Sequence, residues 1–90
     1  MANAKMTEKE IFARVVKTLS KMLTLTNKNV SFEIKGETDI YSDLGIDSVE
    51  VMDLLGFLEK EFGVTIDVEK AAENRTVSDI VRFFANYLIK

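Results

Sequence analysis

Three segments of the chain carry apolar residues at helical spacing, and this periodicity limits the possible fold more than any other feature of the sequence. In residues 7–25, apolar side chains recur three or four positions apart. Thr7 and Glu10 form a capping-box pattern at the start of this segment, which predicts that a helix begins there and ends near Leu25. The face expected to be buried consists of Ile11, Val15, Leu19, Met22 and Leu23.

The other two segments show the same spacing. The second runs from Asp47 to about Phe62 and ends at Gly63, and the last begins near Thr76. Their apolar positions are Val51, Leu54, Leu55, Leu58 and Phe62 in the second segment, and Val77, Ile80, Val81, Phe84 and Leu88 in the last. Residues 67–73 can form a short helix between them. The sequence therefore predicts an all-α, small four-helix bundle, with three longer helices and one short one, in a single domain over residues 1–90.

Residues 26–46 are expected to form a long irregular connection. Its scattered apolar residues should hold it against the core, and they are Val30, Phe32, Ile34, Ile40 and Leu44. Residues 30–34 alternate between apolar and polar like a strand. One isolated strand would have no partner to pair with, so we predict a loop there.

The composition disfavours catalysis by the chain itself. The sequence contains no cysteine and no histidine, which excludes a disulfide, a thiolate nucleophile and the commonest general base and metal ligand. We therefore expect a protein that is not an enzyme. No apolar run reaches the roughly 18 residues of a membrane span, and the N-terminus lacks the apolar core of a signal peptide. A cytoplasmic protein without membrane insertion is expected.

Charge is divided unevenly along the chain. Residues 1–35 hold seven basic and three acidic residues, a net charge of +4, whereas residues 36–90 hold five and twelve, a net charge of −7. An acidic C-terminal part disfavours nucleic-acid binding and favours partners with basic surfaces. The alternative is that these charges form an ordinary solvated surface.

Residues 43–50 show the strongest local pattern. Gly45 permits a turn, Asp47 is a suitable N-cap, and Glu50 completes a capping box three residues later. Ser48 then stands at the first helical position, where free N–H groups and the helix dipole would stabilise a phosphate on its hydroxyl. The plainer alternative is that these residues only start a helix.

The same region also has the spacing of acidic residues found in a calcium loop. Asp39, Tyr41, Asp43, Asp47 and Glu50 occupy positions 1, 3, 5, 9 and 12 of such a loop. The third position is a tyrosine, and the turn glycine falls at the seventh position instead of the sixth. The sequence therefore argues against a calcium site, and no metal site is expected.

Three stretches resemble the acyl carrier protein family. The first is Asp43-Leu-Gly-Ile-Asp-Ser-Val-Glu, which is similar to the family signature, and the second is Leu58-Glu-Lys-Glu-Phe-Gly-Val-Thr-Ile. Thr76-Val at the start of the last helix is the third. The resemblance spans the whole chain and is strongest over residues 40–66.

This resemblance implies that Ser48 carries a covalent 4'-phosphopantetheine arm. A phosphopantetheinyl transferase (holo-ACP synthase) would move the arm from coenzyme A, and Asp47 would help to present the serine. The arm's thiol would hold acyl groups as thioesters for biosynthetic enzymes such as an acyl-ACP synthetase, a ketosynthase or an acyltransferase. The protein would act as a carrier and as a monomer, and it would not bind nucleic acid.

The resemblance also assigns two further sets of residues. Positions matching those that meet partner enzymes are Val49, Glu50, Met52, Asp53, Gly56, Glu59 and Lys60. Positions matching those that surround a sequestered acyl chain are Ile40, Leu54, Leu58 and Ile66. The alternatives are a solvated helix surface for the first set and plain core packing for the second.

Two other functions stay open from the sequence. An aminoacyl or peptidyl carrier would use the same arm, although Gly45-Ile-Asp-Ser is more similar to acyl carriers. An unmodified helical interaction module would carry no arm. Departures from the family pattern at Val49, Gly56 and Lys60 also leave the pathway open between fatty acid synthesis and a specialised or polyketide route.

Overall fold

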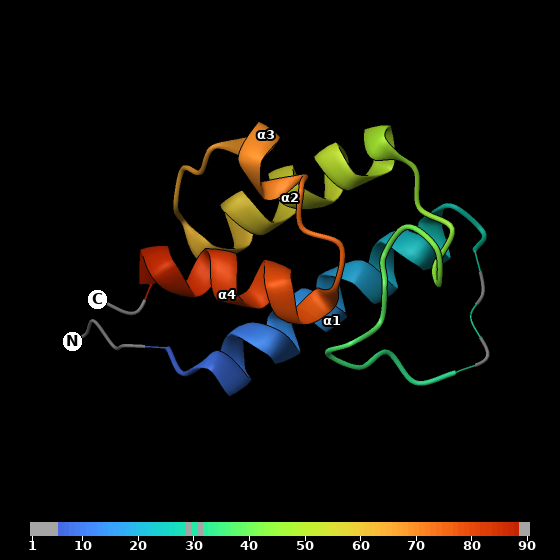
Figure 1. The fold of residues 1–90 in the computed structure, drawn as a ribbon, viewed down its shortest axis with the longest axis horizontal. Helices are drawn as coiled ribbons and strands as arrows, with labels where there is room; N and C mark the ends of the chain where they lie inside the picture. The colour runs from blue at the N-terminus through green and yellow to red at the C-terminus, as the bar shows by residue number, and fades with distance from the viewer. Residues whose placement is uncertain (1–5, 29, 31, 89–90) are drawn as a thin grey trace.

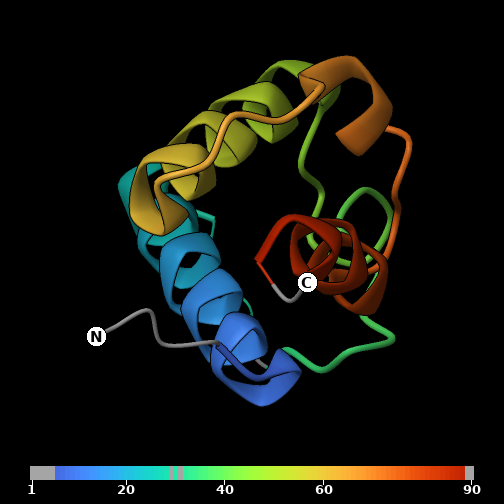
Figure 2. The same ribbon diagram turned by 90° about the vertical axis from the view of Figure 1, so that its left-hand side faces the viewer.

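The computed structural model describes residues 6–28, 30 and 32–88, which form four helices (Figure 1). They are α1 (Glu8–Leu25), α2 (Ser48–Phe62), α3 (Val68–Ala71) and α4 (Val77–Leu88). Helix α1 packs against both α4 and α2, and α3 packs against α2. In the end-on view of Figure 2, α1, α2 and α3 form an arc beside α4. The predicted bundle of three longer helices and one short helix is confirmed.

Capping boxes fix the N-terminal ends of the two longest helices, α1 and α2. The Glu10 N–H donates to Thr7 Oγ1 at 3.1 Å, and the Thr7 N–H donates to Glu10 Oε1 at 2.9 Å. The equivalent bonds of α2 join Asp47 and Glu50 at 2.9 and 3.1 Å. Each pair satisfies backbone donors that a helix start would otherwise leave free. The predicted starts of α1 and α2 are therefore confirmed.

Helix α3 is shorter than predicted. We expected residues 67–73, but the helix covers only Val68–Ala71. Asp67 is its N-cap and accepts a hydrogen bond from the Lys70 N–H, while Ala72 follows as the C-cap. The Glu73 and Asn74 N–H groups bond to carbonyls three residues back, as in a tighter turn, so the α-helical pattern ends early.

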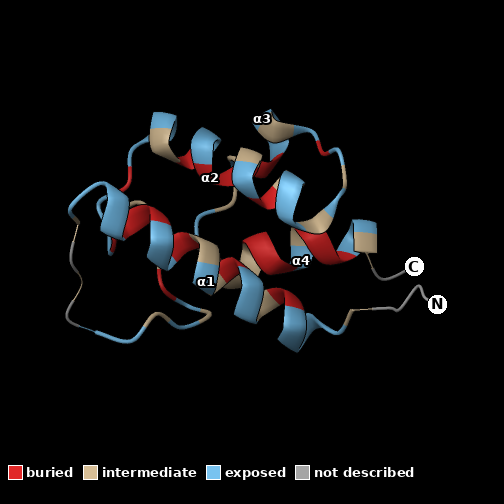
Figure 3. Cartoon of the chain, turned by 180° about the vertical axis from the view of Figure 1, so that it is seen from behind, coloured by how far each residue is buried: buried red, intermediate tan, exposed pale blue. Residues whose placement is uncertain are grey.

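The core is formed by one apolar stripe from each long helix. Figure 3 shows the buried faces of α1, α2 and α4 turned toward the interior. Phe84 is fully buried, and its ring lies 5.2 Å from that of Phe62, measured between centroids. Phe62 and Leu88 are only half-buried but pack against the same cluster. No described helix has the length and apolar character needed to cross a membrane.

The long connection between α1 and α2 packs onto the core as expected, with one exception. Ile40 and Leu44 are buried, Val30 and Ile34 are half-buried, and all four contact the core cluster. Phe32 was predicted to join them, but its side chain is 46% exposed. The backbone bends at Phe32, and this side chain does not join the core cluster that Val30 and Ile34 contact. The predicted role of Phe32 is therefore wrong.

This connection also supports the start of α4. The Val77 N–H donates to Thr38 O at 3.1 Å, and the Ser78 N–H donates to Gly36 O at 2.8 Å. In the reverse direction, the Ile40 N–H donates to Arg75 O at 2.8 Å. Asp39 and Thr76 form an isolated antiparallel bridge, while residues 30–34, apart from 31, which lies outside the description, form no strand. These bonds satisfy backbone groups that a helix end leaves without partners.

The glycine inside α2 and the glycine that caps its C-terminal end should respond to alanine in opposite directions. A Cβ at Gly56 would meet no atom within 4 Å, so Gly56→Ala should stabilise the fold by about 1 kcal/mol through helix propensity. Gly63 has a φ of +68°, and Gly63→Ala should destabilise the fold by about 1 kcal/mol because L-residues are strained there. Urea denaturation of both variants measures these changes. A change of the same sign in the free energy of unfolding of both variants would contradict the prediction.

Candidate functional site

Ser48 is the first residue of α2, and its side chain is exposed. The start of α2 lies at the end of the bundle opposite the ends of the drawn chain (Figure 1). The Asp47 backbone is extended, with φ −91° and ψ 176°, so the chain turns into the helix directly at the serine. Helix N–H groups and the dipole both favour negative charge at this point. A phosphate ester on the Ser48 hydroxyl would therefore be stabilised.

Asp39 organises the loop that leads to the serine. Its Oδ1 accepts hydrogen bonds from the N–H groups of Tyr41 and Ser42, each at 2.8 Å. The Asp39 N–H in turn donates to Asp43 Oδ2 at 2.8 Å. Gly45 follows with a φ of +68°, which lets the chain reverse before Asp47. The loop therefore presents the start of α2 in one defined conformation.

Arg75 ties this loop to the segment before α4. Its Nε lies 2.9 Å from Asp39 Oδ2, and its guanidinium carbon lies 4.9 Å from the centroid of the Tyr41 ring. The Tyr41 hydroxyl donates to Ala72 O at 2.7 Å. Sequence reasoning missed this cluster because Asp39 and Arg75 are far apart in the chain and belong to no shared motif.

The same contacts explain why Asp39 does not resemble a calcium ligand. Its carboxylate is already bound by two backbone N–H groups and by Arg75. The pKa of Asp39 lies below its ordinary value, first because the Ser42 N–H donates to it and then because Arg75 does, although desolvation opposes both. Within the described ranges, no three acidic residues are grouped so that they could hold a metal ion.

Five of the seven residues predicted to meet partner enzymes line one hollow on α2. This hollow, of about 570 Å³, lies next to the short segment after the helix. We call it the α2 hollow, and its lining is Met52, Asp53, Gly56, Phe57, Glu59, Lys60, Val64 and Thr65. Val49, which is 69% exposed, and Glu50 lie nearer the serine, in the first turn. One continuous face of α2 therefore joins Ser48 to the α2 hollow.

The acidic residues of this face are not equivalent. Glu50 is used by the capping box and also lies 3.7 Å from Lys28 Nζ. Glu59 Oε2 accepts a hydrogen bond from the Ile66 N–H at 2.8 Å, a structural role that sequence reasoning missed. Asp53 is exposed, and its carboxylate makes neither a hydrogen bond nor an ion pair with any described residue. Asp53 is therefore the acid most available to a partner.

The four residues predicted to surround an acyl chain all lie in the core. Ile40, Leu54 and Leu58 have no exposed surface, and Ile66 is 7% exposed. They belong to one buried cluster, so the structure brings them together. In this structure the four side chains pack against other core residues, and their role toward an acyl chain stays a prediction.

Comparison with known proteins agrees with the sequence resemblance. Residues 9–84 match the family model described as a phosphopantetheine attachment site. An acyl carrier protein of an Exiguobacterium species is 37% identical over 83 residues, which cover 92% of this chain and 100% of the relative. An acyl carrier protein of Thermotoga maritima is 35% identical over 79 residues, which cover 88% and 93%. A third, from Wolinella succinogenes, is 41% identical over 51 residues, which cover 57% and 67%.

The Asp39 cluster should make stability depend on acidic pH. A carboxyl whose folded pKa is lowered contributes stability above its ordinary pKa of 3.8, and that contribution is lost as pH falls through the folded pKa. Asp39→Asn should therefore lower the melting temperature at pH 7, and this effect should shrink as the pH falls below 3.8. Thermal unfolding from pH 2 to 7 measures this, with Asp53→Asn as the control for an unpaired carboxylate. An Asp39→Asn effect that is equal at all pH values would refute the explanation.

Proposed function

The chain belongs to the acyl carrier protein family, and we propose that Ser48 is the residue that bears its 4'-phosphopantetheine arm. The observation that supports this most directly is the exposed hydroxyl of Ser48 at the first position of α2, directly after the capping residue Asp47. This position lies inside the part of the chain that matches the phosphopantetheine attachment family.

The other described serines lack this setting. Ser20 lies inside α1, where no helix start is available. Ser42 lies in the turn held by Asp39, and Ser78 is half-buried in α4 beside Gly36. Ser31 lies outside the described residues. Ser48 is therefore the only described serine that combines exposure with the first turn of a long helix.

The proposed modification forms a phosphate ester at the Ser48 Oγ. The phosphopantetheine of coenzyme A is transferred to this oxygen, adenosine 3',5'-bisphosphate leaves, and the serine proton is lost. The start of α2 then faces the new negative charge, which the helix dipole favours. Asp47 contributes by fixing the first turn through its bond to the Glu50 N–H, so that Ser48 projects toward the transferase.

We propose that the chain is a carrier and not a catalyst. It has neither cysteine nor histidine, so the arm's thiol would supply the reactive sulfur that the chain itself lacks. Acyl groups would travel as thioesters on this thiol to biosynthetic enzymes such as ketosynthases and acyltransferases. The exposed face of α2, from Val49 to Lys60, would be the surface that these enzymes and the transferase contact.

Substitution of Ser48 tests the attachment site. Ser48→Ala should keep its melting temperature, because the hydroxyl is exposed, and should gain no arm when incubated with coenzyme A and a broad-specificity transferase. Wild type and the matched variant Ser42→Ala should each gain the mass of one arm. Intact-protein mass spectrometry measures the difference. An arm found on Ser48→Ala would end the assignment.

Reversal of charge at Asp53 tests the partner face. Asp53→Lys should slow the transferase reaction roughly tenfold at low salt, because an exposed acid near the serine attracts a basic enzyme surface. The difference should shrink with added salt, since the screening length falls from about 10 Å at 0.1 M to about 3 Å at 1 M.

Transferase kinetics across a salt series measure this effect. Glu8→Lys, with the same charge change in the first turn of α1 at the other end of the bundle, should behave like wild type. If wild type, Asp53→Lys and Glu8→Lys react at equal rates at every salt concentration, the face is merely a solvated surface.

A further inference from the structure

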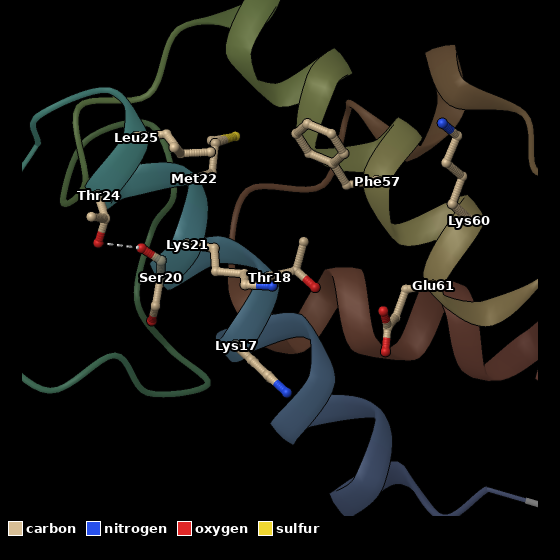
Figure 4. Close-up of a pocket in the computed structure, with 10 residues that line it drawn as sticks. All are labelled: Lys17, Thr18, Ser20, Lys21, Met22, Thr24, Leu25, Phe57, Lys60 and Glu61. Carbon is tan, nitrogen blue, oxygen red and sulfur yellow. Dashed lines mark hydrogen bonds between the residues drawn. The ribbon is translucent and has the colours of Figure 1, made fainter.

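A second and larger groove lies between α1 and α2 (Figure 4), and it shares Phe57 and Lys60 with the lining of the α2 hollow. It has a volume of about 770 Å³ and is open to solvent. We call it the α1–α2 groove, and it is lined by Lys17, Thr18, Ser20, Lys21, Met22, Thr24, Leu25, Phe57, Lys60 and Glu61. None of the residues predicted from the sequence to bind partners lines it, except Lys60.

One end of the groove is apolar and exposed. Leu25, the last residue of α1, is 79% exposed, and Phe57 on α2 is 48% exposed. Figure 4 shows the Phe57 ring projecting toward the α1 side, with Met22 and Leu25 opposite. Met22 is buried and contributes to the floor. Two large apolar side chains thus face each other across an open groove, and no described segment covers them.

Lysines line both sides of the groove. Lys17 and Lys21 lie on the α1 side and Lys60 on the α2 side, and none of the three forms an ion pair with a described residue. The acid in the lining, Glu61, is already paired with Arg14 at 3.1 Å. Three unpaired lysines therefore surround the groove of a chain whose net charge is −3. This local charge is opposite in sign to that of the chain as a whole.

We propose that the α1–α2 groove binds an acidic amphipathic helix of a partner protein. Such a helix lays apolar side chains spaced three or four residues apart into an apolar groove. Here they would contact Leu25, Met22 and Phe57, while carboxylates one or two turns away would reach Lys17 and Lys21. The α1 edge from Lys17 to Leu25 is about 12 Å long, which corresponds to roughly two turns of a bound helix.

The shape and charge of the groove favour this occupant over the others. A flat lipid surface would not reach the floor of a groove between two helices. An acyl chain would stay exposed to water along the open side. A second copy that met the groove with its own groove would bring lysines against lysines, and this like charge disfavours the contact.

This inference is independent of the modification of Ser48, and the test keeps the two apart. The probe is a synthetic helical peptide of roughly 18 residues, with leucines at i, i+3 and i+7 and glutamates one to two turns away. It is titrated into the full chain labelled with ¹⁵N. Saturable amide shifts should appear at Lys17–Leu25 and at Phe57–Glu61. Matched peptides with lysines for glutamates, or with the leucines scrambled around the helix, should bind at least about tenfold more weakly.

Variants of the groove give the quantitative test. Leu25→Ser should weaken peptide binding about tenfold, because it removes an apolar anchor whose side chain the free fold leaves exposed. Lys21→Glu should weaken binding about fivefold and reduce its salt dependence. Lys70→Glu, the same charge change on α3 outside the groove, should bind like wild type. All variants should still accept the arm, which shows that they fold.

Several results would overturn the proposal. They are equal binding of all three peptides, shifts confined to the α2 hollow, or no loss of affinity in Leu25→Ser and Lys21→Glu. Binding to vesicles of anionic phospholipid with the same sensitivity to Leu25→Ser would assign the groove to a membrane surface. Sedimentation that shows self-association relieved by Leu25→Ser would assign it to a second copy. Failure of the wild-type chain to accept the arm would instead contradict its proposed modification, and failure of a groove variant alone would show that this variant does not fold.

Discussion

Burial of one apolar stripe from each of α1, α2 and α4 is the interaction on which the rest of this structure depends. The chain has no cysteine, so no disulfide can support the bundle. A small domain buries a modest share of its surface, and each core side chain therefore matters more than it would in a larger protein. Because the stripes must face one another, the opposite faces of α1 and α2 are turned outward. The exposed face beside Ser48 and the groove between α1 and α2 both follow from this orientation.

Polar interactions then decide where the helices begin and how the long connection runs. The Asp47–Glu50 capping box sets the first residue of α2, and the Asp39 cluster sets the loop before it. These groups are exposed or half-buried, and ion pairs that stay open to solvent add little stability each. Their contribution is geometric: they satisfy backbone groups that have few other partners and thereby hold Ser48 at the end of the bundle.

The features that the sequence predicted are those that depend on neighbouring residues. Capping boxes, the left-handed Gly63 and the apolar periods all act within one or two turns, which is why the starts of α1 and α2 and the place of Ser48 agree with expectation. Other features depend on how separate segments meet. They are the exposure of Phe32, the bond from the Ile66 N–H to Glu59 and the pairing of Asp39 with Arg75. No local pattern marks such contacts, and the α1–α2 groove was unpredicted for the same reason.

Phe57 and Lys60 line both the α2 hollow and the α1–α2 groove, so these two side chains form a shared wall. A side chain adopts one rotamer at a time, and a ligand that draws the wall toward one side changes the shape of the other. Two ligands that require different rotamers of these side chains would be thermodynamically linked, and the effect of the first on the second would equal the effect of the second on the first. In that case a single helical ridge would make two binding events on this small chain depend on each other through side-chain rotation alone.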